Sequence, residues 1–457
     1  MNKFSVTFTI WCLCGLLFFA IPAAGQDTPA SSLSIASQAV APQSQGATLH
    51  ITLQDAIERA KKLSPALTTA LTNAKLAAEA TVQARAANLP NVSGNSQYLY
   101  TEGNGTLSAR FIANNGVHEY IAQTDVHQAI SAPLLVDYRR SIVLHAVAQD
   151  QATIAERGLV VAVVQAYATL FGANGKLKTG EESLQAAQHF VTITTERQKN
   201  GDAAYADVLK ARIQADDSQS ALANAQLALE QARVALALLI FPNVNQPFDL
   251  MDDPSQVLTL PPRSQAQQEA STSNPELDAA SKSVEAARQS LLSGRLGYLP
   301  SLTFDYYYGI DANRFATETT LYDGKRIQNL GYSALATLSV PLFTWGATHS
   351  KVTVAKSEED LARVNLGFAR QKAAGDFDLY YNEAQVARQN LKTRLAAYTD
   401  AMESRRLTLL QYRAGVATAL EVVTAEATVD TESTALYDAK TRYATAIANL
   451  ATLTGVL

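Results

Sequence analysis

The sequence predicts a mainly α-helical fold with a smaller β-sheet portion, assembled from two internal repeats. The first observation is a self-similarity at an offset of 214 positions, which matches Gly201 with Gly415 and Tyr167 with Tyr381. A repeat of this kind indicates one structure built from two similar halves. The second observation is that a Leu-Pro pair in each half is followed by a change from helical to alternating periodicity, which is typical of strands.

Residues 1–25 are predicted to be a secretory signal peptide. Lys3 supplies the positive start, an apolar stretch follows, and small residues precede the expected cleavage point. Both cysteines, Cys12 and Cys14, lie in this segment, so the remaining chain is expected to hold no disulfide and no thiolate site. The alternative is a retained N-terminal anchor. Residues 26–49 are rich in Ala, Ser, Gln and Pro without a regular period, and we expect a disordered lead-in.

The charge and hydropathy of the chain exclude some functions. The formal net charge is −5, and no run of basic residues indicates nucleic-acid binding. After the leader, no stretch is expected to reach the roughly 18 apolar residues of a membrane-spanning helix. Any membrane crossing is therefore expected to use strands.

The first helices are predicted from their boundaries. Residues 52–62 form a short amphipathic pattern. Ser64 is expected to cap the next helix, with Pro65 in its first position, and this helix ends before Leu89-Pro90. The second half repeats these breaks at an offset of 210, at Asn274-Pro275 and Leu299-Pro300.

Each half is predicted to carry two strands after its Leu-Pro break. Apolar and polar residues alternate along residues 302–310, where Leu302, Phe304, Tyr306, Tyr308 and Ile310 share one face. The other predicted strands are residues 330–340, 91–100 and 120–132. A length of about 10–13 residues is enough for a tilted membrane-spanning strand. The polar connections, residues 101–117 and 312–326, are expected to be exposed loops.

Four strands are too few to close a barrel, and open sheet edges are not tolerated in lipid. Either three or more chains therefore share one barrel, or the strands pack in a soluble sheet. Six tyrosines are interpreted as an interfacial girdle, although aromatic residues also favour strands in general: Tyr98, Tyr100, Tyr306, Tyr307, Tyr308 and Tyr332.

The long helices are predicted between prolines and glycines. Residues 134–200 allow a helix of roughly 62 residues, residues 202–241 one of roughly 38, and the early helix adds about 24. Two shorter helices end to end thus match one long helix, which indicates a helical cylinder with a heptad leucine seam. The expected order is a first repeat over 50–240, a connecting belt over 241–263 and a second repeat over 264–457.

The chain resembles the outer membrane efflux proteins, the family of TolC-like channels. The resemblance depends on the doubled pattern, the Leu-Pro breaks, the strand exits at Ala132-Pro133-Leu134 and Val340-Pro341-Leu342, and the two hairpin turns. It implies a homotrimer in which four strands per chain form one transmembrane β-barrel, continued by a long α-helical barrel. It also implies a periplasmic adaptor (membrane fusion) protein and an inner-membrane RND or ABC pump as partners, in addition to outer membrane lipid.

The same resemblance assigns roles near the two turns. Gly201 and Gly415 correspond to hairpin tips for adaptor docking, although each can also be a turn and nothing more. Glu421, Asp207 and Tyr412 correspond to the periplasmic aperture; for both acids the alternative is a solvated helix surface. Two departures weaken the expectation of a charged lock: Thr424 stands where a second acid often lies, and Ala417 where a basic partner can lie.

No sequence motif indicates an enzyme. The chain lacks GxSxG, Walker A and HExxH patterns, and its six histidines have no ligand spacing, so we expect no catalytic, cofactor-binding or metal residues. The predicted function is an exit duct for small-molecule efflux or type I secretion. The alternative is a soluble periplasmic coiled-coil interaction protein.

Overall fold

The computed structural model describes residues 49–101 and 118–455. They belong to one compact unit, Ala47–Leu457. The predicted signal peptide, nearly all of the predicted lead-in and residues 102–117 of the first predicted loop lie outside the described residues. The fold is mainly α-helical with a four-stranded sheet, as the sequence predicts.

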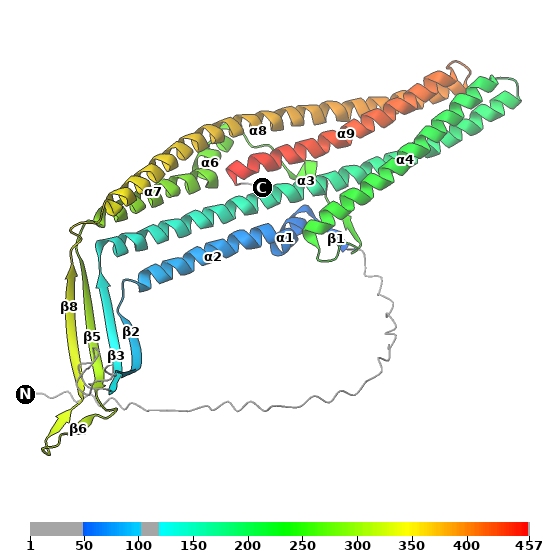
Figure 1. Ribbon diagram of the computed structural model, residues 1–457. Helices are drawn as coiled ribbons and strands as arrows, with labels where there is room; N and C mark the ends of the chain where they lie inside the picture. The colour runs from blue at the N-terminus through cyan, green and yellow to red at the C-terminus, as the bar shows by residue number, and fades with distance from the viewer. Residues whose placement is uncertain (1–48, 102–117, 456–457) are drawn as a thin grey trace, which may run out of the picture. The chain divides into compact units, whose positions relative to one another are not determined.

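The two halves have similar elements in the same order (Figure 1). The first half comprises β1 (Leu49–Ile51), α1 (Leu53–Leu63), α2 (Pro65–Ala86), β2 (Asn91–Tyr100), β3 (His118–Ile130), α3 (Ala132–Lys199) and α4 (Tyr205–Ile240). The remainder comprises β4 (Phe248–Leu250), α5 (Pro254–Val257), α6 (Arg263–Thr272), α7 (Pro275–Leu296), β5 (Ser301–Ala312), β6 (Glu318–Thr320), β7 (Arg326–Gln328), β8 (Leu330–Ser339), α8 (Ala347–Arg413) and α9 (Ala419–Thr454).

The helix starts follow from local capping. The Thr52 hydroxyl accepts a hydrogen bond from the Asp55 amide at 3.1 Å, and the Asp55 carboxylate accepts one from the Thr52 amide at 3.2 Å, which completes a capping box. Ser64 caps α2, which has Pro65 at its first position. Asn274 caps α7 by accepting from the Glu276 amide at 3.0 Å. These boundaries confirm the sequence-based expectations.

The helices form a row in which α3 and α8 are the long members. α2 (22 residues) and α4 (36 residues) both pack along the 68 residues of α3. α7 (22 residues) and α9 (36 residues) both pack between α3 and the 67 residues of α8 (Figure 1). Pairs of shorter helices therefore alternate with single long helices, as the sequence predicts. The two ends of the row are α2 with α4 on one side and α8 on the other.

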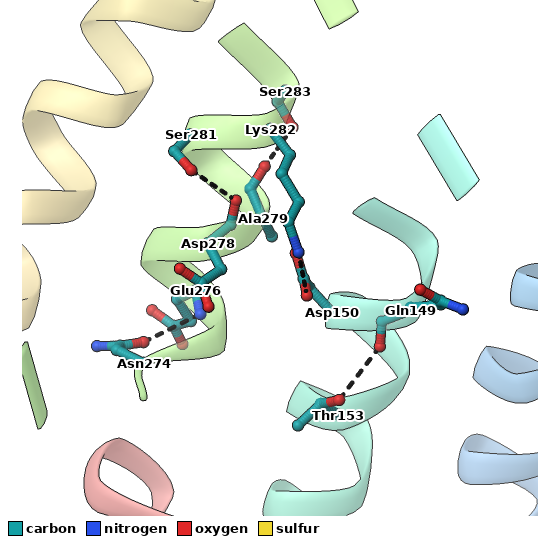
Figure 2. Close-up of polar contacts among 10 residues, drawn as sticks. All are labelled: Gln149, Asp150, Thr153, Asn274, Glu276, Asp278, Ala279, Ser281, Lys282 and Ser283. Atoms are coloured by element: carbon teal, nitrogen blue, oxygen red, sulfur yellow. Dashed lines mark hydrogen bonds and ion pairs between the residues drawn. The ribbon is translucent and has the colours of Figure 1, made fainter. Parts of the chain in front are cut away.

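An ion pair joins α7 to α3 in the middle of this row. Lys282 of α7 places its Nζ 2.8 Å and 2.7 Å from the two carboxylate oxygens of Asp150 on α3 (Figure 2). The Asp150 side chain is largely buried, at 15% exposure. A partly buried carboxylate needs such a partner, because burial without one is costly. This pair therefore fixes which faces of α7 and α3 meet.

The four long strands form one antiparallel sheet in the order β2-β3-β5-β8 (Figure 1). Because residues that face each other across the sheet share a side, the register sorts the side chains. One face is largely apolar and includes Phe304, Tyr306 and Tyr308, while the other includes Asp125, Asp305 and Tyr307. Tyr307 thus lies on the polar face, so its assignment to an interfacial girdle was wrong.

Two predicted irregular segments contain regular structure. The predicted loop 312–326 includes β6, which pairs with β7 as a short antiparallel hairpin around a turn with Gly324 at φ 83°. The predicted belt 241–263 includes the helix α5 and the strand β4, which pairs in parallel with β1. Leu49, expected in the disordered lead-in, is the first residue of β1. The β1–β4 pairing joins Leu49 to Phe248, which are too far apart in the chain for local patterns to reveal it, whereas the β6–β7 hairpin lies within residues 318–328.

One expectation about hydropathy was also wrong. α3 contains an 18-residue window of mean hydropathy 1.4, so it is long and apolar enough to cross a membrane by composition. Its residues Val160, Val163, Val164 and Tyr167 instead form the main core with α1, α4 and α9. Helix packing therefore explains part of the apolar composition of α3, since 33% of this window is buried.

The repeated tyrosines Tyr167 and Tyr381 have matching roles. The Tyr167 hydroxyl donates to the Ile51 carbonyl at 3.2 Å and accepts from the Asp252 amide at 3.3 Å. The Tyr381 hydroxyl donates to the Pro261 carbonyl at 3.2 Å. Each tyrosine therefore attaches a long helix to the belt that lies beside the helix row.

Candidate functional site

The candidate site lies where the two helical hairpins reverse direction. In the first hairpin the Gly201 amide donates to the Gln198 carbonyl and the Asp202 amide to the Arg197 carbonyl, at 3.1 Å and 2.8 Å. This pair of bonds is a Schellman motif, which requires a left-handed residue after the helix end. Gly201 supplies it with φ 85°. A residue with a Cβ atom would be strained at this position.

The second hairpin uses the same motif. The Gly415 amide donates to the Tyr412 carbonyl at 3.0 Å, and the Val416 amide donates to the Gln411 carbonyl at 2.9 Å. Gly415 has φ 78°. The sequence therefore identifies both reversals correctly. Their role as docking tips depends on a partner and stays a prediction.

Glu421 lies in the first turn of α9 and closes a capping box. Its carboxylate accepts hydrogen bonds from the Thr418 amide at 2.6 Å and from the Thr418 hydroxyl at 3.1 Å. The Thr418 hydroxyl also accepts from the Glu421 amide at 3.3 Å. Glu421 is exposed, and the positive end of the α9 dipole favours its charge. The cap explains the position of this acid within one chain and leaves its carboxylate accessible to solvent.

Asp207 occupies the corresponding position of α4 but has a different partner. Ala204 stands at the N-cap and offers no side-chain acceptor. The Asp207 carboxylate pairs with Lys210 on the same helix at 3.3 Å. Within the described residues no hydrogen bond joins Asp207 to Tyr412 or to Glu421. The structure of one chain therefore does not bring the three predicted aperture residues together.

Tyr412 is buried where the two hairpins meet, with only 3% of its surface exposed. Its ring makes an edge-to-face contact with Phe190 of α3, with centroids 5.1 Å apart. Ala211 of α4 and Ala419 and Val422 of α9 complete this small core. Among the described residues the buried Tyr412 hydroxyl has no hydrogen-bond partner. Within one chain, Tyr412 therefore packs through its aromatic ring and not through its hydroxyl group.

Arg197, at the end of α3, connects the two hairpins. Its guanidinium lies over the Tyr412 ring with 4.8 Å between Cζ and the ring centroid, and it also donates a hydrogen bond to the Tyr412 carbonyl. In a second contact between these helices, α8 supplies the arginine: Nη2 of Arg413 lies 3.1 Å from Nε2 of His189 on α3. Each long helix thus supplies one arginine to the other near the turns.

A buried charged cluster lies two to three turns into α9. Arg405 of α8 pairs with Glu426 of α9 at 3.4 Å, although Glu426 is only 5% exposed. Asp430 accepts a hydrogen bond from the Ser183 hydroxyl of α3 at 2.9 Å. Ser183 in turn lies 3.5 Å from the Ser218 hydroxyl of α4. Side chains of all four helices of the two hairpins therefore meet here.

Burial changes the proton affinity of this cluster. It raises the pKa of Glu426 above its ordinary value, although the Arg405 guanidinium opposes the change. Burial also raises the pKa of Asp430, opposed by the Ser183 hydrogen bond and by Arg405. Two acids one helical turn apart thus share a single arginine. Ionising both carboxyl groups of the cluster therefore costs more free energy than it would in water.

Sequence reasoning missed Arg197, Arg405, Glu426 and Asp430. A signal for Glu426 was present, because the buried positions of α9 follow the heptad-like series Val422, Glu426, Val429, Ser433 and Leu436. A carboxylate on an otherwise apolar stripe indicates a buried partner on a neighbouring helix. No such signal exists for Arg197, because its partner Tyr412 is distant in the chain.

The described residues contain no group of three or more His, Cys, Asp or Glu side chains that could hold a metal ion. The site therefore consists of turns, caps, an aromatic contact and ion pairs. Such an arrangement can position helices and present charge to solvent.

Comparison with known proteins identifies a family. The sequence pattern of the family described as "Outer membrane efflux protein" matches residues 56–240 and 266–456, most of the chain. The comparison with curated proteins gave no significant match.

Several solved structures share the fold. The Campylobacter jejuni CmeC outer membrane channel is 18% identical with a TM-score of 0.73, and the match covers 88% of this chain and 85% of that one. The Vibrio cholerae outer membrane protein VceC is 19% identical with a TM-score of 0.71, covering 88% and 96%. The open state of the Neisseria gonorrhoeae MtrE outer membrane channel is 20% identical with a TM-score of 0.72, covering 88% of each chain. At sequence identities this low, the structural similarity supports a common fold and nothing finer.

Proposed function

The chain belongs to the outer membrane efflux protein family, and from this premise we propose that three copies form the exit duct of a tripartite efflux or type I secretion system. It is an outer-membrane channel protein with a periplasmic extension. In the proposed system the duct is a passive conduit. An inner-membrane pump, of the RND or ABC class, supplies the energy.

The observation that carries the proposal is the pair of open sheet edges. Among the residues that the structure describes, β2 and β8 each pair with a strand on one side only. A spanning sheet with free edges leaves backbone groups without partners in lipid, which costs several kcal/mol for each group. Joining β8 of one copy to β2 of the next removes both edges and generates a ring. Three copies of a four-stranded sheet give an even-numbered barrel of twelve strands.

The helices at the ends of the row support the same head-to-tail contact. α8 continues from β8, whereas α2 leads into β2. Both ends expose large apolar side chains that a neighbouring copy would cover. On α8 they include Val354, Leu361, Val364, Phe368, Leu379 and Val386, and on α2 and α4 they include Leu71, Leu76, Val82, Ile213, Leu227 and Leu238.

The two faces of the sheet support a barrel with a polar lumen. Asp125, His127 and Asp305 lie on the polar face, where His127 and Asp305 approach to 2.5 Å between Nδ1 and Oδ1. The opposite face exposes Phe304 and Tyr306. Apolar residues outside and polar residues inside are the pattern of outer-membrane barrels.

At the other end of the helices we propose that the Gly201 and Gly415 turns dock a periplasmic adaptor. We further propose that Glu421, Asp207 and Tyr412 of three copies surround the periplasmic aperture. Glu421 has the clearest support, because its carboxylate is exposed and three copies would form a negative ring that attracts cations. Residues 50–240 and 264–457 are the proposed repeats, joined by the belt 241–263.

Detergent-extracted mass and planar-bilayer conductance, measured on the same sample, test the duct. We expect a trimer that conducts. The variant Phe368→Asp places a charge on the exposed stripe of α8, where Phe368 is 66% exposed, and should give monomers without conductance. Tyr322→Asp, at a fully exposed residue of the turn between β6 and β7, makes a similar change away from the helices and should remain trimeric. A soluble, non-conducting native protein that leaves the membrane fraction in salt would overturn the proposal.

A further inference from the structure

The segment between β8 and α8 exposes a cluster of large apolar side chains. Leu342 is 91% exposed, Phe343 is 72% exposed and Trp345 is 90% exposed. The rings of Phe343 and Trp345 contact each other edge to face, with centroids 4.8 Å apart. A contiguous exposed apolar cluster indicates an interaction surface. Within its own chain this cluster packs mainly on itself.

This cluster is an insertion that only one half of the chain carries. In the first half α3 begins at Ala132 and includes Pro133 in its first turn. In the second half α8 begins only at Ala347, although Pro341 occupies the position that matches Pro133. The offset between the halves rises from 208 at these prolines to 214 at the later tyrosines, so six residues are added here. Phe343 and Trp345 belong to the added segment.

The backbone of the insertion is strained at the tryptophan. Trp345 has φ 51° and is the only non-glycine residue with positive φ among those the structure describes. A bulky residue rarely adopts the left-handed conformation, and such outliers persist where a function requires them. Gly346 follows with φ 79°, and the Ala347 amide donates to the Thr344 carbonyl at 2.9 Å, which closes the turn. The turn presents the Trp345 ring to the surroundings, and the described part of the chain leaves this residue 90% exposed.

The position of the insertion indicates what covers it. It follows directly on Ser339, which pairs with Ser301 at the helix end of the sheet. At the same end Leu299 precedes β5 and is 50% exposed. The chain carries no Asp, Glu, Lys or Arg from residue 327 to residue 350, so β8 and the insertion form one uncharged stretch. In membrane barrels, the end of a spanning strand is where tryptophan and other aromatic side chains meet the lipid headgroups.

We propose that Phe343 and Trp345 form an interfacial anchor that inserts into the periplasmic leaflet of the outer membrane. The partner is the lipid surface, with the ring of Trp345 at the level of the headgroups and Leu342 and Phe343 against the first acyl carbons. The anchor fixes the depth at which the sheet ends and the helices begin. This inference depends on the proposed membrane-spanning sheet.

Because the chain has so few tryptophans, fluorescence can report on the position of Trp345 alone. The sequence has two tryptophans, Trp11 in the predicted leader and Trp345. In the full chain carrying Trp11→Phe, all tryptophan fluorescence comes from Trp345. The protein is reconstituted in phosphatidylcholine vesicles with bromine atoms either near the headgroups or deep in the acyl chains. We expect a larger loss of fluorescence with the shallow bromines than with the deep ones, and weak quenching by aqueous iodide.

Two further variants, each also carrying Trp11→Phe and Trp345→Phe, calibrate the measurement. Phe304→Trp places the probe on the apolar face of the sheet, where Phe304 is 45% exposed. Tyr322→Trp places it between β6 and β7, where Tyr322 is fully exposed, and should be quenched by iodide.

The outcomes separate the anchor from the spanning sheet. If bromolipids quench the probe at position 304 but not Trp345, the anchor is wrong and the sheet is unaffected. In that case iodide quenching of Trp345 indicates water, and no quenching by either agent indicates cover by a neighbouring copy. If bromolipids do not quench the probe at position 304, the spanning sheet itself is wrong.

Discussion

Arg197 and Tyr412 connect the two helical hairpins at the point where both reverse. The Arg197 guanidinium lies 4.8 Å from the centroid of the Tyr412 ring and donates to the carbonyl of the same residue. That carbonyl also accepts from the Gly415 amide, so one acceptor serves the turn of its own hairpin and the arginine of the other.

Replacing Arg197 should loosen both turns. Arg197→Ala removes a hydrogen bond from a charged donor and a cation–π contact, together worth about 1–3 kcal/mol. Because about 1.4 kcal/mol corresponds to a tenfold change, backbone amide exchange around residues 197–204 and 410–418 should accelerate on the order of tenfold. Hydrogen exchange with mass spectrometry measures it. Lys199→Ala removes an exposed charge from the same helix end and should leave exchange near residue 412 unchanged. Equal acceleration in both variants would exclude a specific role for Arg197.

The charge of Glu421 can be separated from its cap. Glutamine still accepts hydrogen bonds from the N-cap residue, so Glu421→Gln should preserve the capping box with Thr418 and the thermal stability. Its reversal potential in a salt gradient should show weaker cation preference, because the ring of charge is gone. Glu421→Ala should show the same loss of selectivity and also a lower Tm. Unchanged selectivity in both variants would remove Glu421 from the aperture.

Two glycines that face each other in the sheet should respond differently to alanine. Gly309 of β5 pairs with Gly331 of β8. A Cβ atom at Gly309 would lie 2.1 Å from the Ala122 carbonyl oxygen and 2.6 Å from the Gln123 Cα, both backbone atoms. Gly309→Ala should therefore cost about 1–3 kcal/mol or more through displaced backbone, with a lower yield of folded trimer on unheated gels. A Cβ at Gly331 meets nothing within 4 Å, so Gly331→Ala is the matched control. Equal yields would show that β3 and β5 are not held at this separation.

The buried Glu426 and the half-buried Asp430 of α9 should give the hairpins an unusual pH dependence. The pKa of Asp430 and that of Glu426 are raised in the folded state, so the folded protein binds more protons than the unfolded one above their ordinary values of 3.8 and 4.5. Their contribution to stability is therefore present at low pH and is lost as pH rises through the raised pKa. Asp430→Asn keeps an acceptor for Ser183 and removes one charge, so the fall in Tm from mildly acidic to neutral pH should become shallower.

Solvent partly screens Asp430, so the expected effect on the unfolding free energy is below about 1 kcal/mol. Asp438→Asn removes an acid from the same helix whose side chain is 65% exposed and should leave the slope of Tm against pH as in the native protein. A slope that Asp430→Asn leaves unchanged would show that another group sets it.

Much of this fold could be predicted because its signals are local. Caps such as Ser64 before Pro65, the proline and glycine breaks, and the alternation along β5 each depend on residues a few positions apart. The repeat then doubled the evidence for the long helices and the four long strands. The turns at Gly201 and Gly415 were predicted for the same reason, since the Schellman motif involves only six consecutive residues.

The sequence by itself determined the order and approximate length of the long helices and the four long strands, the two turns and the sorting of the strand faces. The tertiary structure decided which helix faces meet. Arg197 and Tyr412, and Arg405 and Glu426, come together through packing along long helices, where a rotation of either helix would separate them. The strands β1 and β4 pair although they lie at distant points of the chain. Periodicity predicts that a helix has an apolar side but not which partner covers it, because that choice is made by contacts between distant parts of the chain.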